Sequence, residues 1–231
     1  VSTGPGWTLA LGDCIAGMRE LADLSVDVTI TDPPYEAEAH TKQRRQLGKA
    51  RSGCDQEYRA VLEAPLDFVP ITAQQRIDAA AEIARVTRHA AVVFCQVEAV
   101  ADWKAAFNAA GMPYRRCMPW NKPDAMPSLH GRWPGQEFEA MVLAVHAGAR
   151  PCPIGGKAVE YRATRERGHG NANAGGAPHP TTKPQSLMRE LVEHYSLPGD
   201  TILDAFAGSG STGIAALALG RRFVGFELSP E

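Results

Sequence analysis

Residues 201–213 have the sequence Thr-Ile-Leu-Asp-Ala-Phe-Ala-Gly-Ser-Gly-Ser-Thr-Gly, an apolar run that leads into a glycine-rich turn. A helix-like run follows to about Leu219, and a second strand-like run, residues 222–226, leads directly to Glu227. Glycines let the backbone turn sharply and approach a ligand closely, and the N–H groups of the following helix then point into the site. An acid after the next strand can accept hydrogen bonds from both hydroxyls of a ribose. This order of strand, turn, helix, strand and acid predicts a nucleotide-type cofactor site on an α/β fold.

The glycine turn does not by itself identify the cofactor. Gly208, Gly210 and Gly213 have the G-x-G-x-x-G spacing of dinucleotide-binding folds. However, Asp204 ends the first strand, where the pyrophosphate of a dinucleotide would bring a second negative charge close to the carboxylate. A cofactor with a sulfonium cation and an amino-acid tail tolerates an acid there, which favours S-adenosylmethionine over NAD.

Strand-like and helix-like runs alternate along the rest of the chain, which is typical of an α/β layer fold. In the clearest helix, residues 98–110, the side chains of Val100, Trp103 and Phe107 lie on one face. Residues 147–180 have no sustained period, and a loop of that length is usually functional or disordered. The expected strands cover residues 7–11, 26–31, 90–95, 114–120, 138–145, 201–206 and 222–226, and the other expected helices cover about residues 72–88, 184–195 and 212–219.

The composition bounds the class of protein. With 231 residues and an apolar share of 44%, the chain can form one domain with a full core. The 24 basic and 26 acidic side chains give a formal charge of −2, which excludes a globally basic nucleic-acid coat. The apolar runs are far shorter than the roughly 20 residues of a membrane span, and the N-terminus lacks the pattern of a secretory signal. The five cysteines are scattered and form no C-x-x-C pair, so we expect a cytoplasmic protein without a metal site.

Basic residues nevertheless concentrate in three segments. Residues 42–51 contain five basic side chains and no acid, residues 113–135 contain four and one, and residues 147–183 contain six and two. One such run alone is usually a solvated face, but three runs around one cleft are better explained as a rim that binds the phosphates of DNA. The residues expected to contact DNA are Lys42, Arg44, Arg45, Lys49, Arg51, Lys122, Arg132, Arg162, Arg165 and Arg167.

A second motif, Asp32-Pro33-Pro34-Tyr35, follows directly on the strand-like run 26–31. Two consecutive prolines fix φ, remove two N–H donors and leave rigidly aimed carbonyls. The turn therefore presents a carboxylate, outward carbonyls and an aromatic face, which together suit an exocyclic amino group on a flat ring. Asp32 and the Pro33 carbonyl can accept the two amino hydrogens while Tyr35 stacks on the ring, and the nitrogen lone pair is then directed at an incoming methyl group.

These motifs resemble those of the amino-methylating DNA methyltransferases that use S-adenosylmethionine, in the permuted arrangement called the β class. In that class the target-amino motif precedes the cofactor motif, as Asp32 precedes residues 204–212 here. Residues 12–14 are similar to the segment that touches the cofactor's adenine, residues 120–122 to the tryptophan–lysine segment beside the target pocket, and residues 179–184 to the segment over the methionine end of the cofactor.

The resemblance covers nearly the whole chain and implies a role for each matching residue. The implied catalytic residues are Asp32, Pro33, Pro34 and Tyr35, and the implied cofactor-binding residues are Asp13, Cys14, Asp32, Thr181, Lys183, Asp204, Phe206, Gly208, Ser209, Gly210, Ser211, Thr212 and Glu227.

The fold implied by the resemblance is α/β: a Rossmann-like class I methyltransferase with a seven-stranded, mostly parallel, doubly wound sheet, one antiparallel strand near the edge and a circularly permuted motif order. The strand at residues 7–11 then fills the sheet position beyond Glu227 from the other end of the chain. A single domain is expected over residues 1–231, with residues 36–67 as a DNA-contacting insertion and residues 147–180 as a short target-recognition loop. The ligands are expected at the carboxyl ends of the strands.

The activity implied by the resemblance is methyl transfer from S-adenosylmethionine to the N6 amine of an adenine flipped out of double-stranded DNA, without a covalent enzyme intermediate. Family members with Asp at the first motif position mostly methylate adenine, while Ser is usual for cytosine N4. Adenine is therefore favoured, and cytosine N4 stays an alternative. No metal or membrane partner is expected, a homodimer is compatible with the sequence, and any restriction nuclease is expected to be a separate chain.

Three alternatives from other classes remain open at this point. An NAD-dependent oxidoreductase would use the glycine turn but would leave Asp32–Tyr35 and residues 179–184 unexplained. A methyltransferase that acts on RNA or on a protein amide would use a similar tetrapeptide. A nucleic-acid binder without catalytic activity would have no need of intact chemical motifs.

Overall fold

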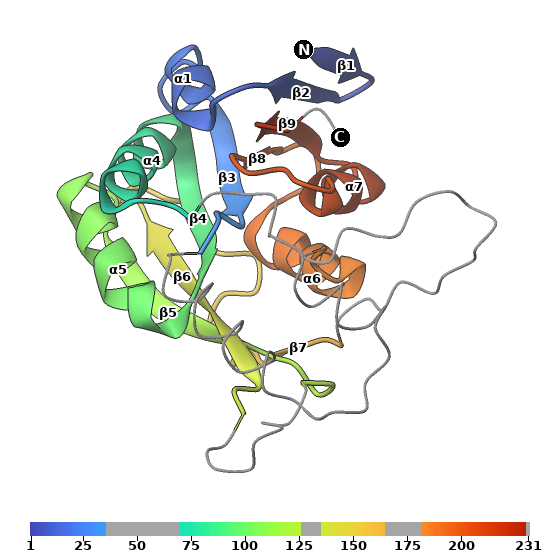
Figure 1. Cartoon of the computed structure of the whole chain (residues 1–231). Coiled ribbons are helices and arrows are strands. Elements are labelled where there is room, and N and C mark those ends of the chain that lie inside the picture. The colour runs from blue at the N-terminus through green and yellow to red at the C-terminus, as the bar shows by residue number, and fades with distance from the viewer. Residues whose placement is uncertain (36–69, 126–134, 165–181, 230–231) are drawn as a thin grey trace, which may run out of the picture.

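The structure, a computed structural model, describes residues 1–35, 70–125, 135–164 and 182–229. They form one sheet of nine strands in the order β1-β2-β9-β8-β3-β4-β6-β5-β7, with helices on both faces (Figure 1). The strands are β1 (Ser2–Gly4), β2 (Trp7–Leu11), β3 (Val26–Thr31), β4 (Thr87–Cys95), β5 (Tyr114–Asn121), β6 (Phe138–Val145), β7 (Tyr161–Arg162), β8 (Thr201–Asp204) and β9 (Arg222–Glu227). The helices are α1 (Cys14–Arg19), α4 (Ala73–Val86), the short 3-10 helix η1 (Val97–Ala99), α5 (Val100–Ala109), α6 (Gln185–Tyr195) and α7 (Ser211–Ala218).

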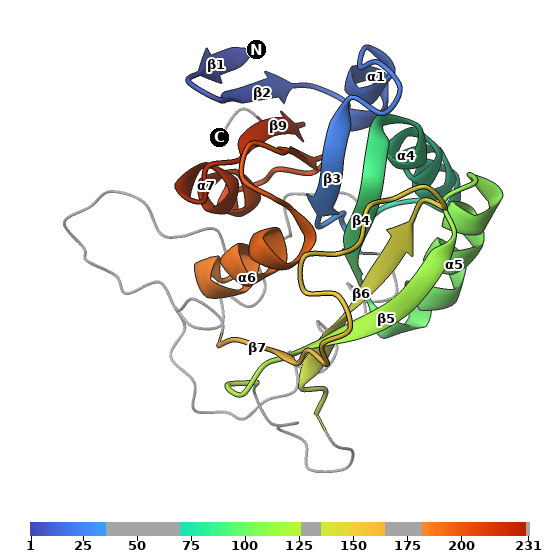
Figure 2. The ribbon, with the colours of Figure 1, turned by 180° about the vertical axis from the view of Figure 1, so that it is seen from behind.

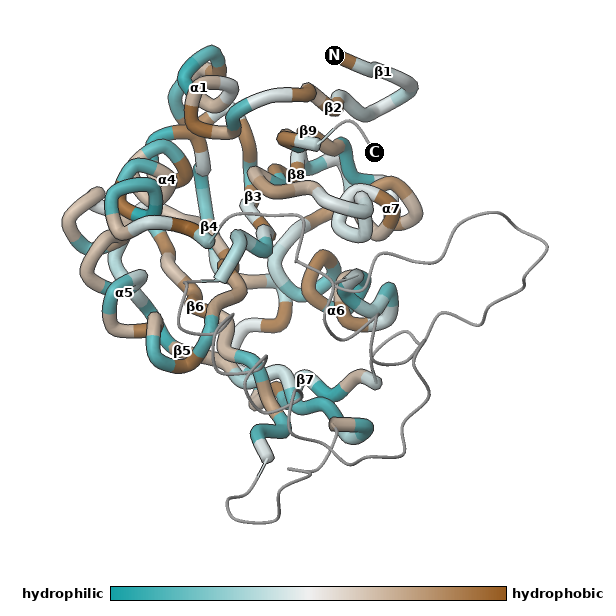
Figure 3. Tube along the Cα trace, in the orientation of Figure 1, coloured by the Kyte–Doolittle hydropathy of each residue, from teal (hydrophilic) through white to brown (hydrophobic). Residues whose placement is uncertain are grey.

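Two apolar layers hold the sheet between its helices. Helices α1, α4 and α5 cover one face, and α6 and α7 cover the other (Figure 2). Successive side chains of a strand point to opposite faces, so in β4 Ala91 and Val93 pack under the first layer while Val92 and Phe94 pack under the second. Polar and apolar residues alternate along the turns of helix α6 (Figure 3) because only one of its faces is buried on the sheet. The α/β class expected from the sequence is confirmed.

The permuted strand order is also observed. Strand β2, from the beginning of the chain, pairs in parallel with β9, with Trp7 opposite Phe223. Strand β6 is antiparallel to both of its neighbours, β4 and β5, as expected for one strand near the edge. The third glycine of the turn serves this packing, because a Cβ at Gly213 would lie 2.9 Å from the Phe223 ring. Helix α7 can therefore lie close against β9.

The expected number of strands was wrong. All seven expected strands are present, but β1 and β7 extend the sheet at its two edges to nine, and β1 adds a third antiparallel pairing to the two that β6 makes. Strand β1 has three residues and turns into β2 through Gly6, whose φ is +81°. Strand β7 has two residues and pairs with the end of β5. Segments this short have no alternating pattern of their own, and they become strands only through pairing with a longer neighbour.

Some element boundaries also differ from the expected ones. Helix α4 ends at Val86 rather than near Arg88, because Thr87 begins the long strand β4. The six-residue helix α1 was not expected, although Asp13 caps it by accepting a hydrogen bond from the N–H of Ala16 at 2.8 Å. The structure places Pro184 at the cap of α6 rather than at its first helical position.

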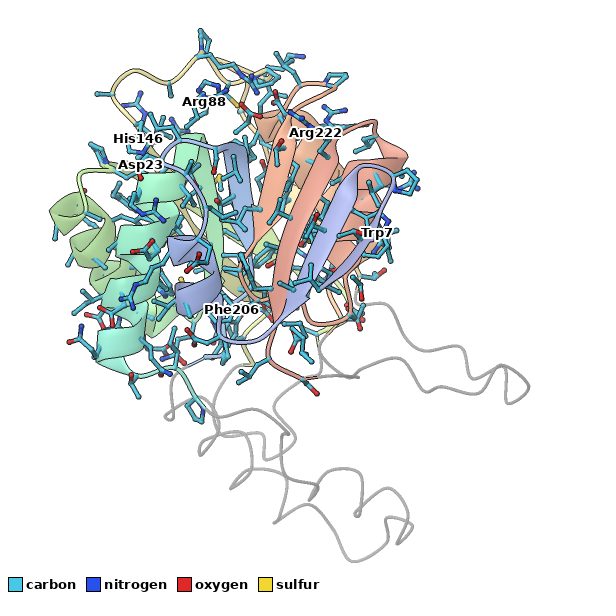
Figure 4. The ribbon with its side chains drawn as sticks, turned by 90° about the horizontal axis from the view of Figure 1, so that it is seen from above. Trp7, Asp23, Arg88, His146, Phe206 and Arg222 are labelled. Carbon is cyan, nitrogen blue, oxygen red and sulfur yellow. The ribbon has the colours of Figure 1, made fainter. Side chains whose placement is uncertain are left out.

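The two ends of the sheet are distinct in chemistry. Arg88, the second residue of β4, and Arg222, the first residue of β9, lie at one end, and Phe206, which lies after β8, is at the other (Figure 4). The carboxyl ends of β3, β8 and β9 therefore meet at one edge of the core, where the two sequence motifs also lie. No helix in the described part of the chain is long and apolar enough to cross a membrane.

Candidate active site

The two motifs are joined by a buried hydrogen bond between neighbouring strands. Strands β3 and β8 pair in parallel, so Thr31 at the end of β3 reaches Asp204 at the end of β8. The Thr31 hydroxyl donates to Asp204 Oδ1 at 2.7 Å. Its oxygen in turn accepts from the N–H of Phe206 at 3.2 Å. The turn that begins at Asp32 and the glycine loop that begins after Asp204 are thereby held side by side.

Asp204 braces the beginning of the glycine loop from within the core. Besides Thr31, its carboxylate accepts hydrogen bonds from the Thr212 hydroxyl at 2.6 Å and from the N–H of Phe206 at 3.1 Å. Burial raises the pKa of Asp204 to about 6, against the opposing effect of the hydrogen bonds from Thr212, Thr31 and Phe206. Both oxygens are therefore bound to protein donors, and the residue ties the loop to the start of helix α7.

The glycine loop, residues 206–210, leaves open space beside the start of α7. Gly208 has a φ of +49° and Gly210 a φ of +75°, conformations that L side chains rarely adopt. A Cβ at Gly210 would meet nothing within 4 Å. Ser211 and Thr212 are buried in the first turn of α7, while Gly208 and Ser209 are exposed. The loop thus presents backbone, rather than side chains, to whatever binds in front of the helix.

Glu227 ends β9 beside this loop. Its Oε2 accepts a hydrogen bond from the N–H of Gly208 at 2.6 Å, and its Oε1 accepts one from the N–H of Ser229 at 2.9 Å. Each oxygen has a further lone pair that can accept a hydroxyl donor. Leu228 follows and is 76% exposed. An exposed leucine directly after the acid provides apolar surface beside the loop, and the sequence analysis did not single it out.

The segment at residues 12–14 lies next to Glu227. The N–H of Gly12 donates to the backbone carbonyl of Glu227 at 2.8 Å. Asp13 caps α1, as described above, and Cys14 is buried behind it. Burial, with the nearby Asp13 carboxylate, raises the pKa of the Cys14 thiol to about 12, so this cysteine is an inert thiol.

Asp32 has one carboxylate oxygen with an ion partner and one without. Its Oδ2 contacts the ammonium of Lys183, which precedes α6. Its Oδ1 is buried and has no hydrogen-bond partner among the described residues. Burial raises the pKa of Asp32, against the opposing effect of Lys183. A buried acceptor without a donor costs about 1–3 kcal/mol of folding stability, and such an oxygen is typical of a site where a ligand supplies the donor.

Glu139, near the start of β6, completes this pocket and was not predicted from the sequence. Its Oε1 contacts the ammonium of Lys122, its Oε2 accepts a hydrogen bond from the Tyr35 hydroxyl at 2.6 Å, and Lys183 Nζ lies 3.6 Å from Oε2. Burial alone would raise the pKa of Glu139, but Lys183 and Lys122 lower it to about 2. The available signal was an acid in the otherwise apolar strand 138–145.

Aromatic rings surround the ammonium of Lys183. Its Nζ lies 5.0 Å from the centre of the Phe94 ring, 5.8 Å from that of Tyr35 and 6.0 Å from that of Trp120. Phe94 and Trp120 meet edge to face and are buried, so two apolar rings pack close to this ammonium. Asp32 and Glu139 together raise the pKa of Lys183 against the effect of its burial, which keeps it a cation.

Most of the residues expected to contact DNA fall outside the described residues, as does Thr181 of the expected cofactor set. Those outside are Lys42, Arg44, Arg45, Lys49, Arg51, Arg132, Arg165 and Arg167. Lys122 and Arg162 are described. Lys122 turns its ammonium onto Glu139, 5.0 Å from the Trp120 ring centre, while Arg162 is exposed on β7. Of the expected segments, residues 36–67 lie outside the described part and residues 147–180 are described only to residue 164.

Metal ligation has no support in the described part of the chain. No group of three or more His, Cys, Asp or Glu side chains there is arranged to hold a metal ion.

The chain is similar to known DNA methylases in sequence and in fold. A family model for N6/N4 methyltransferases, described as DNA methylase, matches residues 26–231. The type II methyltransferase M.HinfI of Haemophilus influenzae is 24% identical over 235 residues, which cover 95% of this chain and 64% of that protein, so the chain spans about two thirds of this relative's length.

Two solved structures share the fold over nearly the whole chain. The M1.HpyAVI–SAM complex superimposes with a TM-score of 0.65 at 22% identity and covers 96% of this chain and 94% of that one. The PvuII DNA methyltransferase, which is cytosine-N4-specific, has a TM-score of 0.74 at 15% identity and covers 99% of this chain and 84% of that one.

Proposed function

The chain belongs to the family of N6/N4 DNA methylases, and from that premise we propose that it transfers a methyl group from S-adenosylmethionine to the N6 amine of an adenine flipped out of double-stranded DNA. Cytosine N4 is the second candidate, because the PvuII enzyme with the same fold acts on that atom.

The observation that carries this proposal is the buried Oδ1 of Asp32, which lacks a donor among the described residues. An exocyclic amine brings two N–H donors and no charge, so it can satisfy this oxygen without disturbing the ion pair between Oδ2 and Lys183. The Pro33 carbonyl is the expected acceptor for the second amino hydrogen. In this arrangement Tyr35 stacks on the ring of the base, as aromatic side chains do with flipped nucleotides.

The glycine loop and its acid fit S-adenosylmethionine. Glu227 suits the ribose hydroxyls, Leu228 suits the adenine ring, and the open space beside Gly210 suits the amino-acid tail. Asp13, Cys14, Phe206, Ser209 and the residues of the α7 start complete the proposed cofactor site. When it is bound, S-adenosylmethionine supplies an electrophilic methyl group on a sulfonium. Because Asp204 and Asp32 bring two carboxylates to this edge, the site favours a cation over a pyrophosphate.

The chain's own residues then perform three tasks. Asp32 accepts a hydrogen bond from the target amine and so aims its lone pair. As the new N–C bond forms, the nitrogen must lose a proton, and the Asp32 carboxylate, whose pKa burial raises, is the nearest acceptor. The buried rings of Phe94 and Trp120 exclude water from the pocket beside the Lys183 ammonium. No covalent enzyme intermediate is required.

The basic segments are proposed to bind the DNA backbone around this pocket. Residues 36–67 and 147–180 then serve as DNA-contacting insertion and target-recognition loop of one methyltransferase domain. Arg162 lies exposed on β7, within the second of these segments. Lys122 acts instead in the wall of the pocket, where its ammonium pairs with Glu139.

The decisive experiment offers tritiated S-adenosylmethionine and the protein to duplex DNA, RNA and a protein extract, and then identifies the modified nucleoside by mass spectrometry. We expect N6-methyladenine in DNA. Detection of N4-methylcytosine instead would support the second candidate, cytosine N4. Label found only in RNA or protein would overturn the DNA assignment. Calorimetry with S-adenosylmethionine and with NAD accompanies the assay, and tighter binding of NAD would overturn the cofactor assignment.

A further inference from the structure

A single carboxylate, that of Glu139, connects both lysines and the tyrosine of the amine pocket. It lies on β6 opposite Trp120 of β5, in a strand whose following residues are buried and apolar. Its two oxygens contact Lys122, Tyr35 and Lys183, which come from three separate parts of the chain. None of these contacts is needed to hold β6 in the sheet, because the backbone pairing with β4 and β5 already does so.

We propose that Glu139 is a positioning residue for methyl transfer, which orients the Tyr35 ring and holds Lys183 so that Asp32 Oδ1 stays free for the target amine. The inference rests on the proposed function, since it assigns Glu139 a part in the same pocket.

The hydrogen bond from Tyr35 to Glu139 fixes the orientation of the Tyr35 ring. The two prolines fix the backbone before Tyr35, but they do not fix the rotation of its side chain. A hydroxyl that donates to a carboxylate at 2.6 Å makes a charge-assisted hydrogen bond, which is about twice as strong as a neutral one. Glu139 therefore selects one orientation of the ring, and this is the surface on which the flipped base is proposed to stack.

Glu139 also holds the ammonium of Lys183 in position. Its ammonium has three donors, and it lies between Asp32 Oδ2 and Glu139 Oε2. Because Glu139 also attracts the ammonium, Lys183 stays beside Oδ2 of Asp32 and does not contact both oxygens of that carboxylate. Without Glu139, the ammonium would be free to move over Asp32 Oδ1 and compete with the amine for that acceptor.

The Glu139 carboxylate also balances the charge around Asp32. Asp32 is faced by Lys183 from the segment before α6, Lys122 after β5, Glu139 on β6, the Tyr35 hydroxyl on its own turn and Asp204 on β8. Two lysines then balance Asp32 and Glu139. Removal of the Glu139 charge leaves an excess cation where positive charge must move from sulfonium to amine, so the rate of transfer should fall.

The test compares Glu139→Gln with Glu137→Gln, a matched change two residues earlier at an exposed position. Single-turnover methylation is measured with saturating DNA and S-adenosylmethionine. We expect E139Q to be slower by roughly 10- to 100-fold and E137Q to be unchanged within twofold. The affinity for S-adenosylmethionine, measured by calorimetry without DNA, should stay within twofold in both variants because Glu139 is not part of the proposed cofactor site.

The pH dependence of the rate separates a positioning role from a merely structural one. Protonation of Asp32 removes the acceptor, so the rate falls as the pH falls. The Glu139 charge raises the pKa of Asp32, and E139Q should therefore move the acid limb of the profile to lower pH while the plateau is lowered. Glu139→Asp keeps the charge but shortens the reach to Tyr35, so it should lower the plateau and leave the limb in place.

Each outcome bears on the proposal. An E139Q rate within twofold of the unmodified protein, or a lowered rate with an acid limb that does not move, would overturn it. Should E139Q fail to unfold cooperatively in urea, Tyr35→Phe removes only the hydroxyl donor, and a plateau within twofold would then overturn the positioning of the ring. If the unmodified protein methylates no DNA, the proposed function fails and this inference fails with it.

Discussion

The two ends of the central sheet both carry buried acids next to bases, but the acids differ in what surrounds them. At the amino ends of the strands, Asp200 contacts Arg150 with both of its oxygens and accepts a hydrogen bond from the N–H of Leu197 at 2.7 Å. Asp27 accepts from Arg88 at 3.0 Å and from the N–H of Thr201 at 2.9 Å. At the carboxyl ends, Asp32 keeps one buried oxygen without a donor among the described residues.

The pKa shifts follow the same division. Burial opposes ionisation of Asp200, but Arg150 and the N–H of Leu197 outweigh it and lower the pKa of this residue. Burial dominates at the other end and raises the pKa of Asp32 and of Asp204. Both oxygens of Asp204 nevertheless accept hydrogen bonds and tie the glycine loop to the core, whereas Asp32 has an unused acceptor that reduces stability and leaves a place for a ligand donor. The comparison therefore separates structural acids from the proposed functional one.

The strongest test of this division is Asp32→Ala. We expect the single-turnover methylation rate to fall by roughly 10³-fold, because the acceptor that aims the amine is lost. The urea midpoint for unfolding should fall only modestly. Lys183 loses its ion partner, but a buried oxygen without a donor is removed and Glu139 still lies 3.6 Å from the ammonium. A rate within tenfold of the unmodified protein would place Asp32 with the structural acids.

Asp204→Asn tests the carboxyl end through the pH dependence of stability. The pKa of Asp204 is about 6 in the folded chain and near 3.8 when unperturbed. Between these values the folded chain keeps a proton that the unfolded chain has lost, so this residue's contribution to stability falls as the pH rises through the window, by up to about 3 kcal/mol. Asn does not titrate. We therefore expect the free energy of unfolding of the variant, relative to that of the unmodified protein, to be greater at pH 7 than at pH 4 when both are measured in urea. A difference that is the same at both pH values would contradict the assignment.

Asp200→Ala is the corresponding change at the amino ends of the strands, and we expect it to destabilise the folded chain at pH 7. It leaves the Arg150 guanidinium and the N–H of Leu197 without their acceptor, which should cost about 2 kcal/mol in the free energy of unfolding at pH 7. Methylation per folded molecule should stay within twofold, as measured at a temperature well below the unfolding midpoint. A selective loss of activity without a loss of stability would break the division between the two ends.

The smallest effect is expected from a pair of glycines with the same backbone conformation. Gly210, in the glycine loop, has a φ of +75°, and Gly220, in the turn before β9, has a φ of +74°. Alanine at either position costs roughly 1–2 kcal/mol of stability. Gly210→Ala should in addition weaken S-adenosylmethionine binding by about tenfold, whereas Gly220→Ala should not. Equal affinities of the two variants in calorimetry would argue against the loop as the cofactor site.

The local parts of the site were predictable from the sequence because their geometry depends on short-range backbone constraints. Glycines at positive φ define the loop after β8, and two prolines define the turn after β3. The alternation of strands and helices predicted the α/β class, and the resemblance to the permuted family predicted that β2 pairs with β9. Strands β1 and β7 were not predictable, because two or three residues have no period and depend on the neighbour with which they pair.

The sequence by itself therefore determined the motifs, their order and the kind of fold that brings strand ends together. Only the tertiary structure decided which side chains meet there: Lys183 contacts Asp32 from 151 residues away, and Tyr35 donates to Glu139 from 104 residues away. It also paired Lys122 with Glu139, a contact that the sequence did not predict. The physical reason is that a backbone conformation is set by a few neighbouring residues, whereas the partner of a buried charge is set by whichever distant side chain the packing of the sheet brings within reach.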